Sequence, residues 1–167
     1  MKEMTKDNLK AALAGESQAH IKYLAFSARA EKEKKPNIAR LFKAISHAEQ
    51  VHATNHLREM GGIGDTVANL GGAVAGENFE VDEMYAAYMA VADLQGEKNA
   101  KRSMNYANEA EKIHAGYYAE AKKLAEAGAD WEIGQIFVCP VCGFTHIGEP
   151  PDHCPVCNTK KELFSAF

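Results

Sequence analysis

Residues 42–52 read FKAISHAEQVH, and residues 104–114 read MNYANEAEKIH. Each stretch ends in a glutamate and a histidine three positions apart, and apolar side chains precede the pair at steps of three and four. Residues three apart on an α-helix point to the same side. The pattern therefore predicts two helices that each carry a carboxylate and an imidazole on a face otherwise suited to burial. The two pairs are Glu49 with His52 and Glu111 with His114.

Three further glutamates fall on the apolar faces of two other predicted helices. Glu16 follows Leu13 along the first helix, and Glu77 and Glu80 lie one turn apart where another helix is expected to begin. Burying five carboxylates without partners is severely unfavourable, and few Lys or Arg residues share these faces. Two Glu-x-x-His pairs plus glutamates from two other helices form the ligand set of carboxylate-bridged di-iron and di-manganese bundles. The alternative for each pair is a solvated surface ion pair.

The distribution of Ala, Glu, Lys, Leu, Gly and Pro predicts a mainly α fold. Helices are expected over residues 5–34, 37–60, 77–96 and 99–127, with the glycine-rich stretch 61–76 as a long connection. Four helices with one long crossover describe the ferritin-like type of four-helix bundle. Composition changes near Trp131, so we expect domains at residues 1–130 and 131–167.

The four cysteines form two C-P-V-C pairs, and both lie in the last 30 or so residues. Two C-x-x-C pairs on separate loops predict a tetrahedral four-thiolate metal site. Gly143 and Asn158 follow the second cysteine of each pair, and both residue types tolerate positive φ. A structural zinc ribbon has the same spacing, and disulfides are the less favoured alternative. The candidate ligands are Cys139, Cys142, Cys154 and Cys157.

Composition and charge exclude several classes of protein. The chain has 167 residues, 46% of them hydrophobic, which argues against disorder, and 23 acids against 19 bases give a net charge of -4. Without a basic excess we expect no nucleic-acid partner. No apolar run approaches the roughly 18 residues of a membrane span, and the N-terminus lacks a secretory signal, so we expect no membrane partner and a cytoplasmic location. Three other histidines, His20, His47 and His56, are expected to be structural or solvent-facing.

Taken together, these segments resemble the rubrerythrin family over nearly the whole chain. The likeness rests on residues 15–19 (GESQA), the two Glu-x-x-His pairs, residues 76–85 (GENFEVDEMY) and the paired cysteines. It implies a ferritin-like di-iron four-helix bundle followed by a small rubredoxin-like iron-binding domain. Asn158 departs from the Gly or Ala common in the family, and we expect a modest effect on the iron's potential.

The resemblance implies a role for each candidate residue. Glu16 would be a terminal ligand of one iron, and Glu49 and Glu111 would bridge the two irons. Glu77 and His114 would bind the second iron. His52 and Glu80 would be alternative ligands of the first iron, exchanged when the site is oxidised. Tyr23 and Tyr85 match tyrosines that hydrogen-bond ligand carboxylates, and the four cysteines would hold a single redox-active iron.

The resemblance also implies an activity and partners. The expected reaction is reduction of hydrogen peroxide to water, with electrons passed from NAD(P)H through a reductase or a small carrier such as rubredoxin to the four-cysteine iron. Family members are at least homodimers, and some exchange helix pairs, so a homodimer or higher oligomer is expected here. In the family the rubredoxin-like domain lies near the di-iron site of the neighbouring subunit. The alternatives are an iron-storage protein and a zinc-stabilised binding module with a metal-free bundle.

Overall fold

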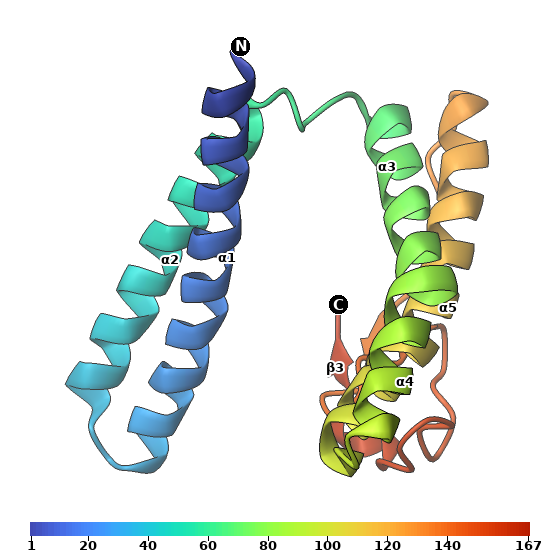
Figure 1. Cartoon of the computed structure of the whole chain (residues 1–167). Helices are drawn as coiled ribbons and strands as arrows, with labels where there is room; N and C mark the ends of the chain where they lie inside the picture. Colours follow the sequence, from blue (N-terminus) through green and yellow to red (C-terminus); the bar gives the residue numbers. More distant parts are fainter. The chain divides into compact units, whose positions relative to one another are not determined.

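The computed structural model describes every residue from Met1 to Phe167 and contains two compact units, Met1–Gly64 and Asp65–Phe167. The first unit is a pair of helices, and the second joins three helices to a small sheet (Figure 1). The predicted mainly helical fold is therefore confirmed. The predicted domain boundary near residue 130 follows the end of the last helix but does not coincide with the division between the two units, and it stays a prediction.

The first unit consists of α1 (Glu3–Lys32) and α2 (Pro36–Glu59), which pack side by side. Pro36 occupies the first turn of α2, where its missing N–H breaks no helical hydrogen bond. The residues buried between the helices are small, which allows a close approach. Two of them are serines whose hydroxyls donate across the pair, Ser27 to the Ala39 carbonyl at 2.8 Å and Ser46 to the His20 carbonyl at 2.9 Å.

In the second unit, α3 (Thr66–Phe79) begins eleven residues before the predicted helix. The expected connection over residues 61–76 is therefore wrong in extent, since only residues 60–65 separate α2 from α3. The Asp65 side chain accepts a hydrogen bond from the Ala68 N–H at 2.8 Å and so caps the new helix. Helix propensity is a weak guide, and here the cap and packing against α5 override the glycines at 71, 72 and 76.

A single turn of π-helix, η1 (Glu80–Met84), joins α3 to α4 (Tyr85–Leu94) without a break in the helical run. Such turns are rare and often mark functional sites, and this one begins at a candidate ligand. The last long helix, α5 (Lys98–Glu126), matches its predicted range closely. Gly128 follows it with φ of 75°, a left-handed conformation that favours glycine at the end of a helix.

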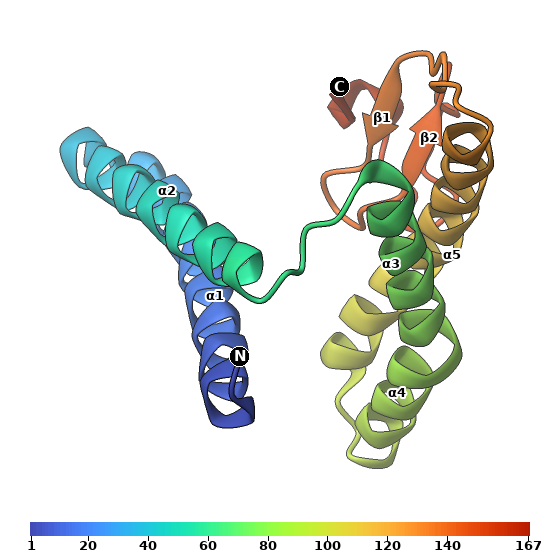
Figure 2. The same cartoon turned by 90° about the horizontal axis from the view of Figure 1, so that it is seen from above.

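The C-terminal segment folds into a small module with three short strands in the order β2-β1-β3, all antiparallel. Its elements are β1 (Ile136–Val138), β2 (Thr145–Ile147), the 3-10 turn η2 (Lys161–Leu163) and β3 (Ser165–Ala166). Figure 2 shows β2 beside α5, and the two elements are in contact. None of the helices combines the length and the apolar character needed to cross a membrane.

Candidate metal sites

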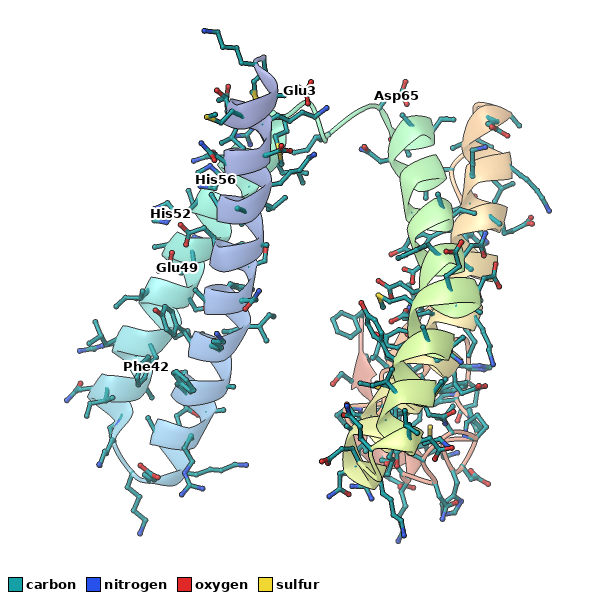
Figure 3. The ribbon with its side chains drawn as sticks, viewed as in Figure 1. Glu3, Phe42, Glu49, His52, His56 and Asp65 are labelled. Atoms are coloured by element: carbon teal, nitrogen blue, oxygen red, sulfur yellow. The ribbon has the colours of Figure 1, made fainter.

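The first candidate site lies between α1 and α2. Glu16, Glu49 and His52 place their ligand atoms within 4.8 Å of one another. The side chains of Glu49 and His52 project from neighbouring turns of α2 (Figure 3), and the His52 Nδ1 lies 3.1 Å from a Glu49 carboxylate oxygen. The His52 side chain is 54% exposed, whereas that of Glu49 is 17% exposed. The predicted helical face therefore brings three candidate ligands together on one helix pair.

The second candidate site lies between α3 and α5. Glu77, Glu111 and His114 place their ligand atoms within 4.8 Å of one another, and all three are half-buried. The His114 Nδ1 pairs with a Glu111 carboxylate oxygen. Glu80 does not belong to this close group, although it lies near enough for Glu111 and His114 to influence its pKa. The structure thus brings together three of the four predicted ligands here and sets Glu80 at the margin, on the π-helical turn.

The carboxylates of the second site repel one another. Burial, a hydrogen bond with Glu111 and the charges of Glu111 and Glu80 raise the pKa of Glu77 from 4.5 to about 7. Burial and the Glu111 charge also raise the pKa of Glu80. Within each unit, none of the five candidate glutamates forms an ion pair with a lysine or arginine. Unpaired carboxylates beside imidazoles have the donor chemistry that suits iron or manganese, so the residues fit a metal pair.

The two candidate tyrosines differ in their surroundings. Burial raises the pKa of Tyr85, and the charges of Glu80, Glu111 and Glu77 raise it further, so its phenol lies beside the second acidic group and stays protonated. Tyr23 packs among aromatic rings, 6.2 Å from the centroids of Phe26 and Phe42, and donates no hydrogen bond to a carboxylate within its helix pair. Its predicted role beside a ligand carboxylate stays a prediction.

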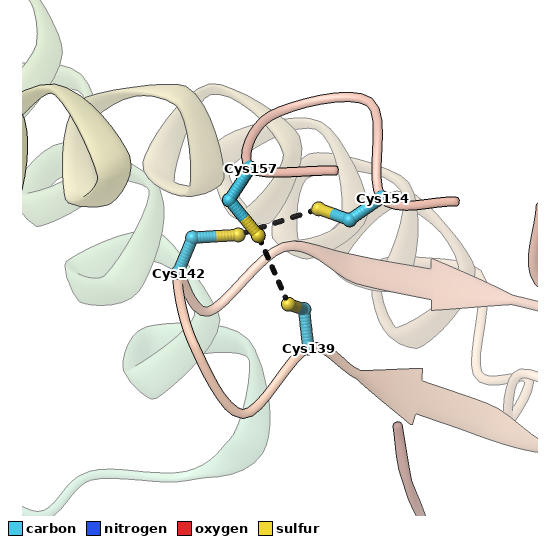
Figure 4. A group of neighbouring side chains, drawn as sticks. All are labelled: Cys139, Cys142, Cys154 and Cys157. Atoms are coloured by element: carbon cyan, nitrogen blue, oxygen red, sulfur yellow. Dashed lines mark hydrogen bonds between the residues drawn. The ribbon is translucent and has the colours of Figure 1, made fainter. Parts of the chain in front are cut away.

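The four cysteines converge on one point of the small module (Figure 4). The sulfurs of Cys139 and Cys157 lie 3.5 Å apart and those of Cys142 and Cys154 3.4 Å apart, beyond the roughly 2.05 Å of a disulfide. The predicted turns are confirmed, because Gly143 has φ of 79° and Asn158 φ of 63°. Each turn is closed by the N–H of that residue, which donates to the carbonyl of the first cysteine of its pair.

The cysteine thiols differ in acidity. Burial raises the pKa of Cys142 and Cys154. Burial also acts on Cys157, but hydrogen bonds from Thr159 and the neighbouring thiols outweigh it and lower its pKa to about 7. Thr159 Oγ1 lies 3.0 Å from the Cys157 sulfur. Cys157 therefore loses its proton more readily than Cys142 and Cys154, and a bound metal ion would deprotonate the remaining thiols.

Three other histidines, His20, His47 and His56, behave as predicted. His47 is exposed. The half-buried His20 has its Nδ1 2.9 Å from the Ser46 hydroxyl, which makes it part of the contact between α1 and α2. His56 is half-buried on α2 beyond Glu49 and His52 (Figure 3) and belongs to neither three-ligand group.

The small module makes specific contacts with the helices of its own unit. It packs against α5 of its own chain, where Tyr106 and Ile113 contact the buried cysteine cluster. The hydroxyl oxygen of Thr145, on β2, lies 2.8 Å from the Nε2 of His114. The sequence contains no signal for this contact, since Thr145 is 31 positions from its partner and follows the cysteine turn as an ordinary strand residue. The family-based expectation that this module lies near the di-iron site of the neighbouring subunit stays a prediction.

Comparisons with known proteins agree with this combination of sites. The rubrerythrin family model matches residues 7–122, and the model of the rubrerythrin rubredoxin-like domain matches residues 137–165. Rubrerythrin-2 of Clostridium acetobutylicum is 42% identical and covers 98% of this chain and 97% of its own length. Nigerythrin of Nitratidesulfovibrio vulgaris is 36% identical, with 98% and 86% covered.

Solved structures give the same result. A structure of nigerythrin in its fully reduced, all-ferrous state aligns with a TM-score of 0.58 at 32% identity, covering 98% of this chain and 86% of the other. The match extends over both the helical region and the cysteine module. The chain carries the Glu/His cluster of a di-iron site and a four-cysteine rubredoxin-like site, and it belongs to the rubrerythrin family.

Proposed function

We propose that this protein is a non-haem di-iron peroxidase that reduces hydrogen peroxide to water and protects against oxidative stress. The observation that carries the proposal is the direct packing of the four-cysteine module on α5, the helix that provides Glu111 and His114. A protein that only stores iron has no use for a one-electron site beside its oxidation centre, whereas an enzyme that turns over must be re-reduced. The second observation is the pair of three-ligand groups, which together make the six-residue set of a carboxylate-bridged metal pair.

A metal pair bound by both three-ligand groups requires that the α1–α2 pair pack against helices α3 and α5 of a second unit. On α2, the exposed side chains of Ile38, Leu41 and Ile45 recur at steps of three and four and lead directly to Glu49 and His52. An exposed apolar stripe that continues into a group of candidate metal ligands indicates a surface that packs against another part of the protein.

The second unit also exposes apolar side chains along the helical run that carries Glu77 and Glu80. There Phe79, Tyr88 and Val91 are about half exposed. We propose that the two apolar faces pack together as a four-helix bundle, which brings both ligand groups to one centre.

The short connection favours a bundle completed by a second copy of the chain. In the ferritin-like topology the crossover returns along the bundle, a distance of about 36 Å for the 24 residues of α2. The connection at residues 60–65 reaches roughly 20 Å when fully extended. The first helix pair of one protomer would then close on the second unit of its partner, as an exchanged homodimer. Lengthening the connection by about 20 flexible residues should shift the protein toward monomers in sedimentation.

The side chains support the reaction in separate ways. When bound, two ferrous ions supply the two electrons that reduce hydrogen peroxide to two molecules of water, with two protons taken up. Glu16, Glu49, Glu77, Glu111 and His114 would hold the ions, while His52 and Glu80 would exchange as ligands. The marginal position of Glu80 supports this exchange. Tyr85 holds a phenol proton beside Glu80 and can donate it as a hydrogen bond.

The four cysteines would hold the iron that returns electrons one at a time. A rubredoxin-type carrier or an NAD(P)H-dependent reductase would supply them in turn. The competing function is iron oxidation and storage, as in ferritins. Mixing the reduced protein with peroxide and, separately, with oxygen distinguishes the two functions. Faster reaction with peroxide and no mineral core support the peroxidase, whereas faster reaction with oxygen or growth of a mineral core contradicts it.

A further inference from the structure

His114 is held at both ring nitrogens, unlike the other histidine of the two ligand groups. Its Nδ1 faces Glu111, and its Nε2 lies 2.8 Å from the Thr145 hydroxyl. The His114 side chain is 27% exposed. His52 has one partner, the Glu49 carboxylate, and is twice as exposed at 54%. His114 is therefore held at both ring nitrogens, one of them by the cysteine module, whereas His52 has a partner at Nδ1 alone.

The hydrogen bonds of Thr145 assign the proton of His114. The Thr145 hydroxyl donates to the Gly143 carbonyl at 3.0 Å, which uses its only proton. Its oxygen can then only accept from His114, so Nε2 carries a hydrogen and donates it. In the metal-free chain the contact between Nδ1 and the Glu111 carboxylate needs a proton between the two atoms, and a metal ion bound at Nδ1 would replace that proton while Nε2 keeps its hydrogen. Thr145 thus selects the tautomer that a metal ion requires at Nδ1.

The same hydroxyl completes a continuous path of covalent and hydrogen bonds between the four-cysteine site and His114. Cys142 is bonded through its backbone to Gly143, the Gly143 carbonyl accepts from Thr145, and the Thr145 oxygen accepts from His114. A pocket of about 350 Å³ lies beside this link, and His114, Thr145 and several apolar side chains line it. Among them are Leu70, Tyr117, Trp131, Ile133 and Ile147.

We propose that Thr145 is a positioning residue that fixes the His114 tautomer and couples the four-cysteine site to the His114 side of the metal pair. Each transfer moves one electron from the reduced four-cysteine iron to the oxidised pair, and no bond is broken along the path. The proposal rests on the proposed function only in assuming that both sites hold iron. It does not require that peroxide be the oxidant.

The test uses the full-length protein with Thr145→Val, which keeps the shape and removes the hydroxyl, and Thr145→Ser, which restores the hydroxyl. In metal-free, isotope-labelled protein, the His114 Nε2–H should give a slowly exchanging NMR signal in the wild type and the serine variant. The valine variant should lose that signal. In iron-loaded protein with the pair oxidised and the four-cysteine iron reduced, electron transfer should slow by about tenfold or more in the valine variant and recover with serine.

Thr66→Val is the control, since Thr66 is an exposed threonine at the start of α3 that belongs to neither metal site. It should leave the His114 signal unchanged. The proposal is overturned if Thr145→Val transfers electrons at the wild-type rate, if it keeps the Nε2–H signal, or if Thr66→Val slows transfer equally. A different result is that electron transfer depends on Thr145 but the protein does not turn over peroxide. That result would contradict the proposed function and support the coupling.

Discussion

The protonation of Glu77, in the second metal site, affects the stability of the fold. The free energy of unfolding of the metal-free protein should therefore depend on pH. The pKa of Glu77 in the folded chain is about 7 because of burial and the nearby Glu111, against 4.5 in the unfolded chain. Between these values the folded state binds more protons than the unfolded state. The free energy of unfolding therefore decreases as the pH rises through this window. Below pH 4.5 the contribution of Glu77 is fully favourable, and above about pH 8 it is lost.

The size of the effect follows from the two pKa values. A rise from 4.5 to about 7 corresponds to a ceiling of about 3.4 kcal/mol at 1.36 kcal/mol per pH unit. Glu77 is half-buried, and solvent screening reduces this to about 1–2 kcal/mol. Glu77→Gln removes the titrating group and relieves the repulsion with Glu111. At pH 8 the metal-free variant should therefore be more stable than the metal-free wild type by about that amount.

Urea unfolding of the metal-free proteins at pH 5 and pH 8 measures this difference. The quantity of interest is the loss of stability between the two pH values in the wild type minus the loss in Glu77→Gln, because other titrating groups cancel. Glu83→Gln is the matched control, since Glu83 is an exposed carboxylate on η1. Equal losses in the wild type and Glu77→Gln would refute the account of the site. A divalent metal ion should reverse the trend, because it binds the deprotonated ligands and its stabilisation grows with pH.

Three further predictions concern single side chains. Cys142→Ser should abolish electron supply from the physiological donor while the pre-reduced iron pair still consumes one peroxide, and turnover at the normal rate in a donor-coupled assay would contradict the relay. Glu80→Ala should leave the helical circular dichroism unchanged and slow formation of the oxidised site in stopped-flow absorption, because only the exchanging ligand is lost; an unchanged rate would argue against that role. Asp65→Ala should cost about 1 kcal/mol in urea unfolding through loss of the α3 cap, whereas Asp93→Ala, which removes an exposed ion pair with Lys101, should cost less.

The sequence predicted the ligand groups well because helical spacing is a local property. Glu49 and His52, three positions apart, share a face in any α-helix, and so do Glu111 and His114. The cysteine turns were equally predictable, since Gly143 adopts the positive φ that its residue type favours. Each of these features depends on a few neighbouring residues and needs no knowledge of the tertiary packing.

Features that depend on distant contacts were not predictable in this way. The glycines around residues 71–76 indicated a loop, but packing against α5 and the Asp65 cap make the segment helical. The π-helical turn at Glu80 changes the phase of its helix, and no residue pattern announces it. The contact between Thr145 and His114 joins a strand of the small module to α5, and only the folded unit brings the two side chains together.

The most direct test of peroxide reduction with an internal electron relay is an anaerobic titration of the fully reduced protein with hydrogen peroxide. Absorption and EPR spectra would follow the iron pair and the four-cysteine iron separately. The account predicts that one peroxide per pair oxidises the pair to completion with water as the product. The four-cysteine iron should then lose its electron to the pair, at a rate set by transfer between the sites. An iron pair that stays reduced after one equivalent of peroxide, or a four-cysteine iron that never transfers its electron, would contradict the central claim.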